Sequence, residues 1–152
     1  MSEIVVSRTI EASPERVWEV VTDLDHAHET LSGVVSVQRM TDGPYAVGTR
    51  WRETRTMFGR EATEEMWVAQ SDPHRGTQVR AESGGADYVT EFTLTPLDEG
   101  ARTELSVRFD AEMTAPSVLQ KVGMKVMGGI AARATRKALE QDLADIAAAA
   151  EA

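Results

Sequence analysis

The sequence predicts an α+β fold in which an antiparallel sheet of about seven strands wraps around a long C-terminal helix, with two short helices after the first strand. Two observations support this order of elements. Several segments between residues 4 and 113 alternate apolar and polar residues, as half-buried strands do, and residues 117 to 150 keep helical apolar spacing without a proline. A sheet with one apolar face must have that face covered, and the terminal helix is the large apolar helix available to cover it.

The N-terminal segment predicts a strand followed by two short elements. From Ile4 to Glu11 the residues alternate in type, and Arg8 interrupts the apolar face. Ser13 and Pro14 are typical of an N-cap and a first helical position, and helical apolar spacing follows them. A second short helix or a loop is expected from residue 25 to 32, before the next strand.

Residues 47 to 113 predict a meander of antiparallel strands. Strand-like runs of about ten residues are separated by stretches rich in the residue types that favour turns. These turns are Phe58-Gly59, Asp72-Pro73-His74-Arg75-Gly76, Ser83-Gly84-Gly85 and Asp98-Glu99-Gly100.

The C-terminal stretch predicts one or two helices. A straight helix of this length would be about 50 Å long, whereas a compact domain of this size is about 40 Å across. We therefore expect a break, and Gly128-Gly129 is placed to make it. Residues 117 to 127 would then act as a movable cover over a cavity. In the second half Leu139, Leu143 and Ile146 share one face, which should lie on the sheet.

Length and composition restrict the class of protein. With 152 residues the chain is expected to be a single domain spanning residues 1–152. It contains no cysteine, so disulfides and thiolate metal sites are excluded, and it carries neither a signal-peptide pattern nor an apolar run of membrane-spanning length. We expect a cytoplasmic protein without membrane insertion. A formal charge of −9 argues against nucleic acid as a partner.

The alternation also predicts which side chains face the helix. In the strand around Trp51, the residues Trp51, Glu53, Arg55 and Met57 share one face, and we expect it to point inward. Similar inward rows are Tyr88, Thr90, Phe92 and Leu94; Leu105, Val107, Phe109, Ala111 and Met113; and, in competition with Trp67 on the opposite face, Ala62, Glu64, Met66 and Val68.

This mixture of apolar and charged residues has two interpretations. Glu53 and Arg55 could lie near a strand end as a solvated or structural ion pair. Alternatively, they could be the polar groups of a small-molecule cavity whose walls are apolar. The ligand-binding candidates of the second interpretation are Trp51, Glu53, Arg55, Met66, Tyr88, Phe92, Phe109, Met113, Met124 and Met127.

Several local motifs resemble one known family. They are Ile10-Glu11-Ala12-Ser13-Pro14-Glu15-Arg16-Val17-Trp18, Val47-Gly48-Thr49-Arg50-Trp51, Asp72-Pro73-His74-Arg75 and Gly100-Ala101-Arg102-Thr103. Together they resemble the polyketide cyclase and dehydrase-like branch of the START-like superfamily, also called SRPBCC, Bet v 1-like or helix-grip. The resemblance implies a cavity between sheet and helix for a lipid, sterol, quinone or polyketide. Glu29-Thr30-Leu31 departs from the aromatic-proline pair that many members have there.

Other chemistry finds little support in the sequence. His26 and His28 lie among acidic residues, but a solvated acidic loop explains them better than a metal site, and neither a metal nor a cofactor is expected. No nucleophile motif is present, so catalytic residues stay unassigned. Two functions remain open. The first is binding of a small hydrophobic, lipid-like, aromatic or polyketide-like ligand, with or without cyclase or dehydratase activity. The second is a protein-interaction module, as in co-chaperone or ribosome-associated relatives of the fold.

Overall fold

The computed structural model describes the backbone of residues 2–57, 59–83, 86–113 and 118–152. Side chains are described for residues 3–56, 59–82, 86–111 and 132–152.

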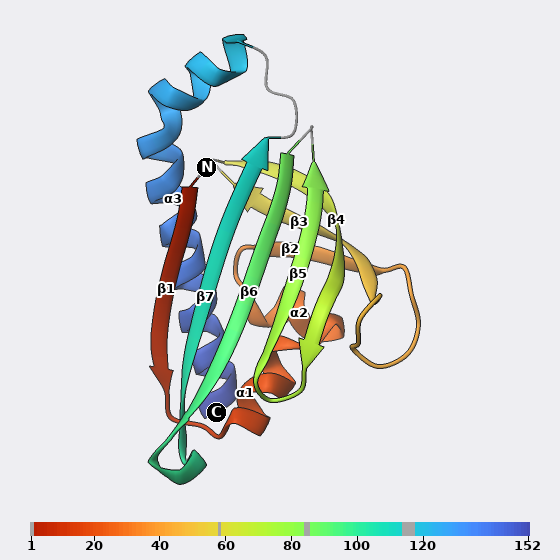
Figure 1. The fold of residues 1–152 in the computed structure, drawn as a ribbon. Coiled ribbons are helices and arrows are strands. Elements are labelled where there is room, and N and C mark those ends of the chain that lie inside the picture. The colour runs from red at the N-terminus through yellow and green to blue at the C-terminus, as the bar shows by residue number, and fades with distance from the viewer. Residues whose placement is uncertain (1, 58, 84–85, 114–117) are drawn as a thin grey trace.

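The order of elements is the predicted one: a strand, two short helices, six strands and a long helix (Figure 1). Two short 3₁₀ turns, Leu24–His26 and Asp98–Gly100, complete the order. The strands are β1 (Ser2–Ile10), β2 (Val34–Arg39), β3 (Arg50–Met57), β4 (Arg60–Asp72), β5 (Gly76–Ser83), β6 (Ala86–Leu97) and β7 (Arg102–Met113), and the helices are α1 (Pro14–Val21), α2 (Ala27–Thr30) and α3 (Val118–Glu151).

The strands form one seven-stranded sheet in the order β1-β7-β6-β5-β4-β3-β2, and every neighbouring pair is antiparallel. Strands β2 to β7 are therefore a meander, and β1 joins its far edge beside β7. In Figure 1 the second half of α3 runs along one face of the curved sheet, with α1 and α2 near its C-terminal end. The predicted α+β fold, an antiparallel sheet wrapped around a C-terminal helix, is confirmed.

Helix α1 forms where its N-terminal residues predict it. The Oγ of Ser13 accepts a hydrogen bond from the backbone N–H of Arg16 at 3.2 Å, and Pro14 occupies the first turn. Because the first N–H groups of a helix lack partners within it, this cap stabilises the helix start.

The strand register confirms the predicted inner rows. Residues directly opposite each other in antiparallel strands project to the same face, and Trp51 pairs with Met66 while Glu53 pairs with Glu64. The register therefore assigns the row of Ala62, Glu64, Met66 and Val68 to the inner face and Trp67 to the outer face. Val68 in that row is only 1% exposed, whereas Trp67 lies on the outer face under the guanidinium of Arg50.

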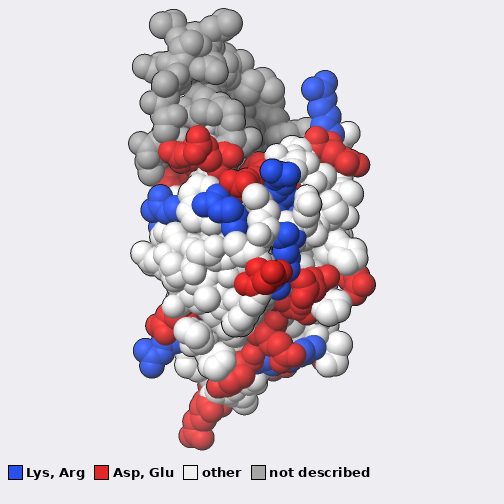
Figure 2. Space-filling view, turned by 90° about the vertical axis from the view of Figure 1, so that its right-hand side faces the viewer, with Lys and Arg blue, Asp and Glu red and all other residues white. Residues whose placement is uncertain are grey.

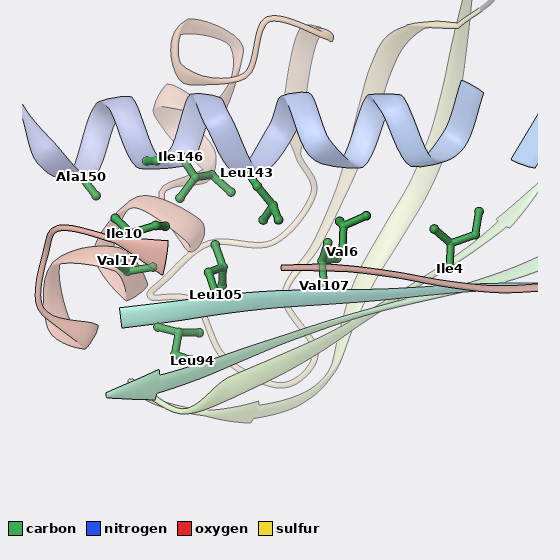
Figure 3. Close-up of a cluster of buried hydrophobic side chains, with 11 residues drawn as sticks. Ile4, Val6, Ile10, Val17, Leu94, Leu105, Val107, Leu143, Ile146 and Ala150 are labelled. Atoms are coloured by element: carbon green, nitrogen blue, oxygen red, sulfur yellow. The ribbon is translucent and has the colours of Figure 1, made fainter. Parts of the chain in front are cut away.

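The main core lies between α1, the second half of α3 and the strands β1, β6 and β7. Ile10, Leu105 and Leu143 are almost fully buried in it (Figure 3). Leu143 and Ile146 point from α3 toward the sheet, and Leu139 packs at the edge of the cluster. The prediction that these three residues face the sheet is confirmed.

Helix α3 is a single element from Val118 to Glu151, so the predicted break at Gly128-Gly129 is wrong for its secondary structure. Each glycine costs a helix about 1 kcal/mol relative to alanine, which good helix formers on both sides can offset. The movable cover predicted for residues 117 to 127 depends on side chains outside the described ranges and stays a prediction. Within the described residues, no helix is long and apolar enough to span a membrane.

Candidate functional site

Burial changes along the inner face of β6 and β7. Leu94 and Leu105 are 3% and 0% exposed, because α1 and the C-terminal part of α3 cover them. Further along the same strands, on the same face, Tyr88, Thr90 and Phe109 are only partly buried. The inner face therefore has a closed apolar end and an incompletely covered end, and the candidate site lies at the second.

Two aromatic rings form a wall at the incompletely covered end. The rings of Tyr88 and Phe109 stack with their centroids 5.8 Å apart and an interplanar angle of 23°. The register places them diagonally on adjacent strands, since Tyr88 pairs with Ala111 and Thr90 with Phe109. Phe92, the third predicted aromatic residue, packs against the main core and marks the boundary between the two ends.

A cluster of three charged side chains joins β3 to α3, and the strands β4 and β5 separate β3 from the strands of this wall. The Nε of Arg55 donates to Glu53 Oε2 at 2.7 Å. Its Nη1 and Nη2 donate to Asp142 Oδ1 and Oδ2 at 3.1 and 2.9 Å, a two-pronged ion pair. The indole N–H of Trp51 donates to the other oxygen of Glu53 at 3.4 Å. We call Glu53, Arg55 and Asp142 the charged triad.

The triad is buried rather than solvated. Glu53 and Asp142 are each 8% exposed. Burial alone would lower the pKa of Arg55, but the charges of Asp142 and Glu53 raise it above its ordinary value, so the guanidinium keeps its charge. Burial raises the pKa of Asp142, and the neighbouring Arg55 opposes that shift. The charged triad therefore links the sheet to α3. Three of the five guanidinium N–H groups of Arg55 donate hydrogen bonds within the triad.

Glu64 connects the charged triad to the aromatic wall. It pairs with Glu53 across β3 and β4, so its half-buried side chain projects to the inner face. Burial and then the charge of Glu53 raise the pKa of Glu64, while Arg55 opposes them. Burial, together with the charge of Glu64, raises the pKa of Tyr88. Glu64 therefore lies on the inner face between Glu53 on β3 and Tyr88 on β6.

A family model described as polyketide cyclase / dehydrase and lipid transport matches residues 1–151. The chain belongs to this family. The match confirms the resemblance found in the sequence motifs. No curated protein has a detectably similar sequence.

Solved structures of this fold superpose over nearly the whole chain. The aromatase/cyclase Zhui from Streptomyces sp. R1128 has a TM-score of 0.81 at 17% identity, covering 99% of this chain and 93% of its own. Truncated norcoclaurine synthase from Thalictrum flavum has a TM-score of 0.72 at 16% identity, covering 96% and 91%. A START superfamily protein from Mycobacterium smegmatis has a TM-score of 0.63 at 16% identity, covering 91% and 97%. At these identities the likeness establishes the fold alone.

The remaining predicted site residues, Trp51 and four methionines, do not belong to the aromatic wall as far as their side chains are described. Trp51 is 3% exposed and belongs to a second core cluster, against which Met66 packs. Trp51 therefore orients Glu53 from within the core. The side chains of Met113, Met124 and Met127 lie outside the described ranges.

Asp142 is the member of the charged triad that sequence reasoning missed. It lies three residues after Leu139 and four before Ile146, which places it on the core-facing stripe of α3. A carboxylate on such a stripe must be paired, and this could have revealed it. One turn later, Asp145 Oδ2 accepts hydrogen bonds from the N–H and the hydroxyl of Ser32, both at 2.9 Å.

The two histidines of the predicted acidic loop lie among acidic side chains. His26 Nδ1 lies 2.8 Å from an oxygen of Asp23 in an exposed hydrogen bond, which raises the pKa of His26. Among the described residues, no group of three or more histidine, aspartate and glutamate side chains is arranged to hold a metal ion. His74 stacks edge-on against Trp18 and is exposed, away from the charged triad.

A separate groove of about 350 Å³ lies between the edge strand β1 and α3. It is lined by Val5, Ser7, Arg8, Arg136, Glu140 and Leu143, among others, and the guanidinium of Arg136 donates to the carbonyl of Val5 at 3.2 Å. Its open, polar lining differs from the apolar walls that bury small organic ligands.

Proposed function

We propose that this protein binds a small apolar ligand with an aromatic ring on the incompletely covered end of its inner face, against Tyr88 and Phe109. The observation that carries the proposal is the change in burial along β6 and β7. Leu94 and Leu105 are packed shut, whereas inward-facing aromatic rings on the same strands keep access to solvent. Exposed aromatic area on a concave face gains free energy when a ligand displaces water from it.

The polar groups at this end suit ligand orientation. A binding site needs apolar walls for affinity and a few placed polar groups for specificity. Tyr88 offers a hydroxyl and Glu64 a carboxyl group, and both are partly buried. The charged triad fixes β3, the strand next to the one that carries Glu64, against α3.

Cyclase or dehydratase activity is the second candidate, supported by the family description and by the aromatase/cyclase among the structural neighbours. Such a reaction needs a group that exchanges protons with the ligand. Among the described inner-face residues, Glu64 and Tyr88 can do so, because Glu53, Arg55 and Asp142 are committed to one another. No catalytic residue is assigned beyond these two candidates.

The described surface favours a ligand-binding role over a protein-interaction module. Large exposed apolar side chains are Val5 on β1, Val35 on β2, and Met40 and Val47 in the connection after β2. Strands β1 and β2 are the opposite edges of the sheet, so Val5 lies apart from the other three and the four residues do not form one continuous patch. On the face drawn in Figure 2, basic and acidic side chains lie intermixed.

Calorimetric titration with 2-(2-naphthyl)ethanol, an uncharged two-ring compound, tests the binding site. Wild type should bind it, and Tyr88→Ala should bind it about tenfold more weakly, because one wall ring is lost. Val89→Ala is the matched control, since Val89 is the next residue on β6 and faces the other side of the sheet. Equal affinities for wild type and Tyr88→Ala would contradict the proposed site.

A further inference from the structure

We infer that the ligand of this site carries a protonated amine rather than a carboxylate, and that Glu64 determines this preference. The inference rests on the proposed function, because it concerns the ligand held against Tyr88 and Phe109. It follows from the distribution of charge on the inner face and from the partners that each charged group already has.

Negative charge exceeds positive charge on the described inner face around the site. Glu53, Glu64 and Asp142 are acidic, and Arg55 is the basic residue among them. Arg55 uses its Nε, Nη1 and Nη2 to hold Glu53 and Asp142. A carboxylate on a ligand would therefore meet a guanidinium that is already paired, and a second carboxylate nearby would repel it.

Glu64 is differently placed from the two acids of the charged triad. Its partner across the strands is another acid, Glu53, and it is less buried than Glu53. Because the carboxylates of Glu64 and Glu53 lie on paired residues of the inner face, an additional positive charge beside Glu64 would be stabilised. A ligand cation can supply that charge.

The aromatic wall adds a second attraction for the same group. Glu64 and Tyr88 both project to the inner face with β5 between their strands, where the small Ala81 pairs with Met66 on one side and with Tyr88 on the other, and the Tyr88 ring stacks on Phe109. An ammonium group between a carboxylate and an aromatic face gains an ion-pair hydrogen bond and a cation–π interaction together. The ligand class that fits is an arylalkylamine, whose ring packs on the wall and whose amine reaches Glu64.

Three compounds of equal ring system test the inference: 2-(2-naphthyl)ethylamine, 2-(2-naphthyl)ethanol and 2-naphthylacetate. At neutral pH wild type should bind the amine about tenfold more tightly than the alcohol, the effect of one charge-assisted hydrogen bond, and the acetate most weakly. Glu64→Gln should bind the amine and the alcohol equally. Glu61→Gln is the matched control, because Glu61 lies on the same strand, is exposed and pairs with the outward-facing Thr56.

The control separates local recognition from the overall negative charge, since both variants remove one carboxylate. An amine preference that persists in Glu64→Gln, or that Glu61→Gln abolishes equally, would overturn the inference. So would acetate binding as tight as amine binding in wild type. If the alcohol binds and only the preference is missing, the proposed site stands without this inference. If none of the three compounds binds, the proposed function itself fails.

Discussion

The guanidinium of Arg55 donates to both carboxylate oxygens of Asp142, 87 residues away in the sequence, at 3.1 and 2.9 Å. Both side chains are largely buried, and Glu53 accepts a hydrogen bond from the Nε of the same guanidinium. Removing one partner of such a pair leaves a buried charge without compensation, which destabilises a protein much more than losing an exposed ion pair does.

Arg55→Leu should therefore lower the free energy of unfolding by about 3 kcal/mol, measured by urea denaturation, because Glu53 and Asp142 both lose their cation. The double variant Arg55→Leu with Asp142→Leu should be more stable than Arg55→Leu alone, because one buried carboxylate, Glu53, rather than two is left without a cation. Glu140→Ala on the exposed side of α3 is the control and should change stability by less than about 0.5 kcal/mol. Additive effects of the two leucine substitutions would show that the two side chains are not coupled.

Leu143 is the α3 residue whose burial the sequence predicted and the structure confirms, at 2% exposed. Leu143→Asp should abolish cooperative folding, because burying an unpaired charge costs several kcal/mol, comparable to the stability of a whole domain. Leu143→Ala should cost about 2 to 5 kcal/mol through the cavity it leaves. Circular dichroism during thermal unfolding measures both, and a near-wild-type melting temperature for Leu143→Asp would contradict the central position of α3.

The backbone at Gly76 leaves no room for a side chain. A Cβ added there would lie 2.8 Å from the carbonyl oxygen of Phe92, a backbone atom that cannot move without shifting β6. Gly76→Ala should destabilise the domain by about 1 to 3 kcal/mol, as overpacking does. Gly33→Ala is the comparison, since its Cβ would meet only the tip of Arg55 at 3.4 Å and should have a smaller effect. Similar unfolding free energies for both variants would contradict this explanation.

The carboxyl group of Glu64 should titrate above its ordinary value, because burial and Glu53 raise its pKa against the opposing charge of Arg55. Between its unfolded and folded pKa values the native state binds more protons, so this contribution to stability is present at low pH and is lost as the pH rises through the folded pKa. Glu64→Gln should therefore gain stability relative to wild type as the pH rises through the titration of Glu64. Carbon-13 NMR titration of the Glu64 carboxyl measures the shift directly, and in Glu53→Gln the pKa should fall.

The sequence predicted the fold well because periodicity reports which side of each element faces the core. Trp51, Glu53 and Arg55 were placed on the inner face by alternation alone, and the register agrees. Asp142 was not predicted as their partner, because pairing across 87 residues depends on how α3 crosses the sheet. The angle at which α3 crosses the sheet cannot be predicted from local residue spacing.

The sequence also did not predict which inward-facing side chains belong to the aromatic wall and which belong to the buried core. Trp51 and Tyr88 both occur in inward rows of mixed polarity, but the first is packed into a core cluster and the second is partly exposed. Which inward residues stay accessible depends on how far along the strands α1 and α3 cover the sheet. How much of the inner face is covered depends on how the helices pack on the sheet. Alternation therefore predicts which face a side chain is on, but it does not predict how deeply that side chain is buried.

The most direct test is to locate a bound ligand by NMR, using 2-(2-naphthyl)ethanol and isotope-filtered nuclear Overhauser measurements. We expect contacts from the naphthyl protons to the rings of Tyr88 and Phe109, and no contacts to Leu94 or Leu105 at the closed end. Contacts confined to Val5 and Arg136 in the groove beside β1, with none to either ring, would contradict it.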